Sequence, residues 1–99
     1  MKIKIQSIHF DADKKLLDLI EEKVGKLDHF YDGIVGSSVI LKLEKSDTSE
    51  NKVAEIRLEI KGNDLFAKRQ CKTFEEAVDQ SVGALRAQLK KYKEKMKKL

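Results

Sequence analysis

The chain is short of several residue types, and each shortage limits what the protein can be. Its 99 residues include one cysteine and no proline. A single cysteine cannot close an internal disulfide, which fits a reducing compartment, so we expect a cytoplasmic protein. No apolar run approaches the length of a membrane span, and the start MKIKIQSIHF is too short and polar for a signal peptide. We therefore expect neither a membrane protein nor a disulfide-stabilised secreted domain.

The sequence also lacks an internal repeat and any linker-like stretch that would separate two folding units. Apolar residues make up 40% of the chain and charged residues 38%, and the apolar ones fall in periodic segments. Such a composition is typical of a globular protein, and this length allows one modest core. We predict a single domain covering residues 1–99.

The first half of the chain predicts a strand, a helix and a second strand. Residues 1–8 alternate polar and apolar side chains, the two-residue period of a half-buried strand. Asp13 is a plausible N-cap for a helix, and apolar residues then follow at helical spacing. They are Leu16, Leu17, Ile20, Val24 and Leu27. Val39, Leu41 and Leu43 alternate with polar or mixed positions and indicate the second strand, which leads into a polar hairpin loop at 46–51.

The second half predicts two further strands and a long helix. Residues 55–61 alternate strictly, and Gly62-Asn63 forms a turn into a fourth strand at about 65–72, whose inward face the pattern does not assign. Thr73 and Glu76 form a capping box that opens the last helix. Its apolar seam comprises Val78, Val82, Leu85, Leu89, Tyr92 and Met96. A helix reaching Lys98 would exceed the width of a four-stranded sheet, so we expect its last turns to project.

The predicted order β-α-β-β-β-α indicates an α+β domain. Both helices can cover one face of a four-stranded sheet, which leaves the other face to solvent or to a partner. The residues predicted on that other face are polar, as solvent exposure requires. They are Glu55, Arg57, Glu59 and Lys61.

Basic charge is concentrated at the end of the chain. Residues 86–99 hold seven Lys or Arg and one acid, whereas residues 1–81 hold 14 basic and 16 acidic residues. A concentrated basic surface on an otherwise balanced domain points to a polyanionic partner. One helical stripe consists of Arg86, Lys90, Lys93 and Lys97, with Lys91, Lys95 and Lys98 in a neighbouring row.

The alternative is a solvated face whose lysines complement the negative end of the helix dipole. That alternative explains the last turn but not Arg86 and Lys90, which lie two or three turns earlier. Lys23 and Lys26 on the first helix favour nucleic-acid binding, because two helices side by side on the sheet would join these cations into one broad patch.

Aromatic residues are scarce, at 6% of the chain. Tyr92, His29, Phe30 and Tyr31 are the candidates for stacking on a base, whereas Phe66 and Phe74 are expected in the core. This scarcity favours recognition of folded RNA through its shape and backbone over sequence reading of single strands.

Catalysis finds little support in the sequence. Cys71 lies in a predicted strand and is interpreted as a small core residue, and His9 and His29 are far apart in the chain. One cysteine, two histidines and no Ser-centred motif do not form a nucleophile with its base. There is no metal-ligand cluster and no glycine-rich phosphate loop. We predict a protein that is not an enzyme and has no cofactor.

Five segments carry a family pattern in this order: LLDLIEEKVGKLDHFYDGI, VILKLEK, AEIRLEI, FA and FEEAVDQSVGALRAQLKKYKEK. They closely resemble the ribosome hibernation promoting factor and ribosome-associated inhibitor A family, nearly end to end. The resemblance implies a β-α-β-β-β-α fold similar to a double-stranded-RNA-binding domain. It also implies binding to 16S-type rRNA of the small ribosomal subunit, in the channel between head and body where messenger and transfer RNA would sit, and silencing of translation in stressed or stationary cells.

The resemblance also implies which residues contact ribosomal RNA. Lys23 and Lys26 match the first-helix contacts, and Lys45 in the LEK motif is a further match. Including Lys97 from the stripe, the predicted RNA-binding set is Lys23, Lys26, Lys45, Arg86, Lys90, Lys91, Lys93 and Lys97. Because the sequence ends at Leu99, we expect the short family type, a monomer off the ribosome, in which any pairing of ribosomes depends on a separate modulation factor.

Two other functions stay open at this point. One is a general double-stranded-RNA-binding module without preference for the ribosome. The other is a regulatory interaction domain that contacts a transcription factor through the exposed sheet face, for which Arg57 and Lys61 would matter more than Arg86 and Lys90.

Overall fold

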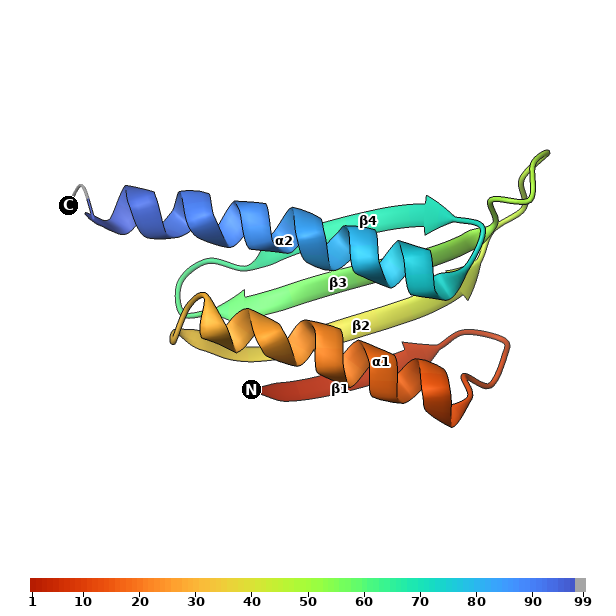
Figure 1. The fold of residues 1–99 in the computed structure, drawn as a ribbon, viewed down its shortest axis with the longest axis horizontal. Helices are drawn as coiled ribbons and strands as arrows, with labels where there is room; N and C mark the ends of the chain where they lie inside the picture. The colour runs from red at the N-terminus through yellow and green to blue at the C-terminus, as the bar shows by residue number, and fades with distance from the viewer. Residues whose placement is uncertain (98–99) are drawn as a thin grey trace.

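The structure, a computed structural model, describes residues 1–97 and has the predicted α+β architecture (Figure 1). A four-stranded sheet is covered on one face by two helices. The elements are β1 (Lys2–Ser7), α1 (Lys14–Gly25), a short 3-10 helix η1 (Lys26–His29), β2 (Ile34–Leu43), β3 (Lys52–Ile60), β4 (Leu65–Cys71) and α2 (Phe74–Lys97). The predicted order of strands and helices is confirmed. Lys98, which we predicted beside the stripe, lies outside the described residues.

The sheet follows the order of the strands in the chain. Its order is β1-β2-β3-β4, with β1 parallel to β2 and the other two pairs antiparallel. The parallel pair requires a crossover connection, which α1 supplies, whereas the remaining strands follow one another through turns. Both helices run in the same direction across the sheet, so their C-terminal ends lie at the same end of the molecule (Figure 1).

Capping residues fix where the two helices begin. The Asp13 carboxylate accepts a hydrogen bond from the Leu16 amide at 2.8 Å, as an N-cap does. The Thr73 hydroxyl accepts one from the Glu76 amide at 3.1 Å, which confirms this half of the predicted capping box. α2 is about 36 Å long at roughly 1.5 Å per residue and extends past the ends of β3 and β4 (Figure 1).

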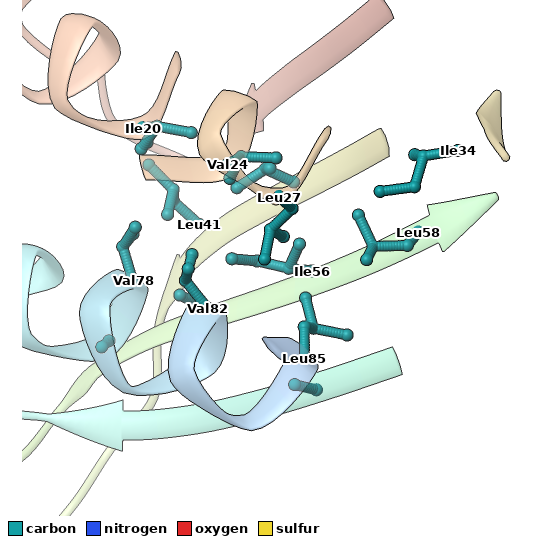
Figure 2. Close-up of a cluster of buried hydrophobic side chains, with 14 of the residues drawn as sticks. Ile20, Val24, Leu27, Ile34, Leu41, Ile56, Leu58, Val78, Val82 and Leu85 are labelled. Carbon is teal, nitrogen blue, oxygen red and sulfur yellow. The ribbon is translucent and has the colours of Figure 1, made fainter. Parts of the chain in front are cut away.

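The core lies between the sheet and the helices (Figure 2). Ile20 and Val24 of α1 and Leu85 of α2 are fully buried. They pack with residues from the inward face of the central strands, which include Val39, Leu41, Ile56 and Leu58. Burial of each such side chain is worth about 1.5–3 kcal/mol. On β4 the buried residues are Ala67 and Cys71, which confirms that Cys71 is a small core residue.

Three expectations about individual side chains were wrong. Met96 is 49% exposed, because the last turns of α2 have no sheet beneath them (Figure 1). Phe66 is 43% exposed, because it pairs with Arg57 in register and therefore lies on the outer sheet face. Lys61 lies in the turn after β3 and not on the strand.

Gly83 lies within α2, where glycine is unfavourable by about 1 kcal/mol relative to alanine. A close approach of another element would explain it, but a Cβ at this position would meet no atom within 4 Å. We therefore expect Gly83→Ala to raise the free energy of unfolding by about 1 kcal/mol and Tm by about 4–8 °C. Urea and thermal denaturation followed by circular dichroism measure this change, and a lower Tm would contradict it.

Candidate nucleic-acid interface

The C-terminal half of α2 presents exposed cations to solvent. The predicted residues there are Arg86, Lys90, Lys91, Lys93 and Lys97, and all of them are exposed. Within residues 1–97, none of these side chains takes part in an ion pair. We call this set the α2 cation row. Cations that lack an ion-pair partner attract counterions from solution, and these counterions are released when phosphate groups bind.

A groove runs beside this row where α2 meets the segment that follows η1. It has a volume of about 260 Å³ and is lined by Phe30, Gly83, Arg86, Ala87, Lys90 and Lys93. The Arg86 guanidinium lies over the Phe30 ring, 5.1 Å from its centroid. A cation–π contact at an exposed site is worth about 0.5–1 kcal/mol and restricts where the guanidinium points. Sequence reasoning considered Phe30 for stacking but did not find this pairing.

A second aromatic contact holds the same segment against α2. The rings of Tyr31 and Tyr92 meet edge to face with their centroids 5.5 Å apart. Burial and the neighbouring Tyr92 raise the pKa of Tyr31, so the Tyr31 phenol stays neutral at physiological pH. The consecutive residues Phe30 and Tyr31 therefore both contact α2, at Arg86 and at Tyr92, and connect it to the segment that follows η1.

The two predicted cations near the end of α1 lie in a mixed-charge area. The Lys23 ammonium is 3.2 Å from the Asp79 carboxylate of α2, and the Lys26 ammonium is 3.5 Å from Glu22. Surface ion pairs of this kind are worth about 0–1 kcal/mol, so an RNA phosphate can compete for either ammonium. Lys23 and Lys26 lie on the helical face, as predicted, but they are partly neutralised there, unlike the α2 cation row.

Lys45 lies apart from the other predicted residues. It is exposed in the loop at 44–51 between β2 and β3. This loop projects from the end of the molecule opposite the C-terminal end of α2 (Figure 1). The structure therefore does not bring Lys45 together with the α2 cation row, and a contact from Lys45 would need an extended partner.

Acidic residues gather at the other end of the helical face. Glu75, Glu76 and Asp79 of α2 line a groove with Leu19 and Lys23 of α1. Glu75 and Glu76 occupy the first turn of α2, where they complement the positive end of the helix dipole. The helical face is therefore polarised from acidic to basic along α2. The first-turn acids were visible in the sequence, but their proximity to Lys23 follows only from the packing of the two helices.

Ion pairs link charged residues on the outer sheet face around β2, β3 and β4. The Lys42 ammonium lies 2.8 Å from Glu55 and 3.3 Å from Glu44, and Lys68 contacts the same two carboxylates at 4.0 and 3.6 Å. Hydrogen bonds to Glu55 and Glu44 raise the pKa of Lys42, so it stays charged. Arg57 is 3.6 Å from Asp64. These ion pairs satisfy much of the charge on β2, β3 and β4, which makes this part of the sheet a weaker surface for a polyanion than α2.

Groups that could perform chemistry are dispersed. Burial raises the pKa of the Cys71 thiol, which keeps it protonated and a poor nucleophile. His9 is exposed in the loop between β1 and α1, with φ of 64°. Within the part of the chain that the structure describes, no three His, Cys, Asp or Glu residues are placed to hold a metal ion. No helix within residues 1–97 is long and apolar enough to cross a membrane.

The fold and this surface together define a class of protein, a small α+β domain whose long C-terminal helix carries an unneutralised basic face. The family follows from the sequence. The chain belongs to the Sigma 54 modulation protein / S30EA ribosomal protein family, whose model matches residues 3–97. The predicted family resemblance is thereby confirmed.

Individual relatives cover almost the whole chain. A ribosome hibernation promoting factor of Pseudomonas putida is 32% identical over 99 residues, which are 100% of this chain and 93% of the relative. One from Klebsiella oxytoca is 27% identical over 97 residues, 98% of each chain. The N-terminal domain of Thermus thermophilus Protein Y has a TM-score of 0.81 at 25% identity, covering 93% of this chain and 99% of that one.

A ribosomal subunit interface protein from Coxiella burnetii has the same fold, with a TM-score of 0.82 at 22% identity. The likeness covers 94% of this chain and 98% of that one. The predicted β-α-β-β-β-α fold is therefore one that solved structures of related proteins share.

Proposed function

We propose that this protein is a non-enzymatic ribosome hibernation factor. It binds 16S-type rRNA of the small ribosomal subunit in the channel for messenger and transfer RNA, and so inhibits translation in the cytoplasm under stress or in stationary phase. The observation that carries the proposal is the α2 cation row, which is exposed and unpaired within residues 1–97. The names of the relatives support the same role.

The mechanism is occlusion by a rigid body attached through electrostatics. The α2 cation row contacts phosphates of the ribosomal RNA, and affinity comes largely from release of their counterions. Lys23 and Lys26 contribute less, because each must first give up its carboxylate partner. Lys45 contacts RNA on a separate part of the channel wall. We propose a monomer off the ribosome, with any pairing of ribosomes dependent on a separate modulation factor.

Co-sedimentation with purified small subunits tests the proposal. We expect binding at low salt, with the logarithm of the association constant falling with the logarithm of salt concentration at a slope of about −3 to −4 for four or five phosphate contacts. An arbitrary RNA duplex of matched length should bind at least about tenfold more weakly. The predicted RNA-binding cations are spread over both helices and the loop at 44–51, and such a pattern matches the phosphates of one folded RNA better than those of a regular duplex.

Failure to co-sediment at low salt would overturn the proposal. Equal affinity for the subunit and for the arbitrary duplex would instead identify a general double-stranded-RNA-binding module. Binding that depends on Arg57 and Lys61, and not on α2, would point to the outer sheet face and to a protein partner.

A further inference from the structure

The groove beside Phe30 has features that phosphate binding alone does not require. Its lining combines an aromatic ring and the apolar surface of Ala87 with the exposed backbone of Gly83, and Arg86, Lys90 and Lys93 surround it. No acidic residue lines it. A ligand that contacts both the apolar lining and the surrounding cations must have a flat, apolar portion and an anionic portion.

We propose that this groove binds one unstacked nucleobase of the RNA, with Lys90 and Lys93 on the adjoining phosphate. The inference rests on the proposed function and specifies how one nucleotide is held. Bases stack on aromatic rings and on guanidinium planes irrespective of their sequence, and Phe30 and Arg86 offer both. The volume of about 260 Å³ lies below the roughly 300–1,000 Å³ of sites for drug-sized ligands, so a single ring system fits.

Gly83 gives independent support for an open groove. Because a Cβ there would meet nothing within 4 Å, packing within the protein does not require glycine. Gly83 lines the same groove as Phe30 and Arg86, where a larger side chain would occupy the space of the base. Gly83 therefore leaves this part of the groove open.

The outer sheet face offers a matched pair for comparison. Arg57 lies over the ring of Phe66 at 5.5 Å, much as Arg86 lies over Phe30. Arg57, however, forms an ion pair with Asp64 at 3.6 Å, so its charge is neutralised. Arg86 has no such partner within residues 1–97. Substitution of Phe66 therefore controls for the loss of an exposed phenyl ring.

Two substitutions test the site on intact small subunits. Gly83→Leu fills the groove without changing charge and should lower affinity about tenfold. Phe30→Leu should also lower affinity for the small subunit about tenfold, whereas Phe66→Leu should leave it unchanged. Melting temperatures confirm that each variant is folded. Wild-type affinity of Gly83→Leu and Phe30→Leu would overturn the inference, even if the cation row proved essential.

A direct measurement separates this site from the function of the whole protein. In NMR titrations of the wild-type protein, adenosine 5′-monophosphate should shift the Phe30 ring protons and the Gly83 amide, and ribose 5-phosphate should not. Equal shifts with both probes, or none with either, would show that the groove does not bind a base. Because no ribosome is present, a shift confined to the nucleotide supports the groove even if co-sedimentation fails.

Discussion

Reversing Arg86, Lys90 and Lys93 to glutamate is expected to lower affinity for the small ribosomal subunit by about 1,000-fold or more at physiological salt. Each change removes a cation and places an acid opposite RNA phosphate, and such like-charge contacts cost several kcal/mol. A loss of about 4 kcal/mol corresponds to three orders of magnitude in Kd. Co-sedimentation or fluorescence anisotropy with labelled protein measures the loss.

The triple variant should stay folded. All three side chains are exposed and none forms an ion pair within residues 1–97, so each substitution should change stability by about 0.5 kcal/mol or less apart from the contact of Arg86 with Phe30. Circular dichroism and a thermal melt establish this point. If binding survived the reversal in a folded protein, the cation row would be only a solvated helix face.

A matched control separates a defined surface from net charge. Lys2, Lys4 and Lys61 are exposed, and none is ion-paired in the described part of the chain. Lys2 and Lys4 lie on β1 and Lys61 follows β3, so none belongs to α2. Reversing these three gives the same net charge as the α2 variant and should retain most of the affinity. An equal loss in both variants would show that overall charge, not α2, drives binding.

The fold was predictable from the sequence because its strongest signals are local. Strict alternation in β3 and apolar spacing in α1 and α2 follow directly from which faces are buried. The inward face of β4 was not assigned because its buried residues are small, Ala67 and Cys71, and a large phenylalanine on the same strand faces outward. Met96 continues the apolar spacing of α2, but no spacing rule reports where the sheet beneath a helix ends.

The candidate site was predictable only in part, for a similar reason. Residues on one helix keep a fixed spacing, so the α2 cation row could be read from the sequence. The pairing of Lys23 with Asp79 and the stacking of Arg86 on Phe30 join residues more than 50 positions apart, and only the packing of α1 against α2 brings them together. The distance of Lys45 from the row likewise depends on the direction in which β2 crosses the sheet.

The packing side of α2 provides the second large effect. Leu85 is fully buried and extends from α2 toward β3, where Ile56 and Leu58 lie (Figure 2). Leu85→Ala should lower the free energy of unfolding by about 2–5 kcal/mol, because it removes buried methyl groups and leaves a cavity. Tm should fall by more than about 10 °C in a domain of this size. Met96→Ala on the same seam should cost about 0.5 kcal/mol or less, since Met96 is 49% exposed.

Binding by Leu85→Ala then tests whether packing and recognition are separate properties of α2. Well below its Tm, this variant should bind the small subunit within about threefold of the wild type, because its exposed cations are unchanged and the folded state still predominates. The α2 reversal has the opposite pattern, with stability kept and binding lost. If Leu85→Ala lost binding while fully folded, the precise seating of α2 on the sheet would itself determine affinity. If it lost less than about 1 kcal/mol of stability, the buried position of Leu85 would be wrong.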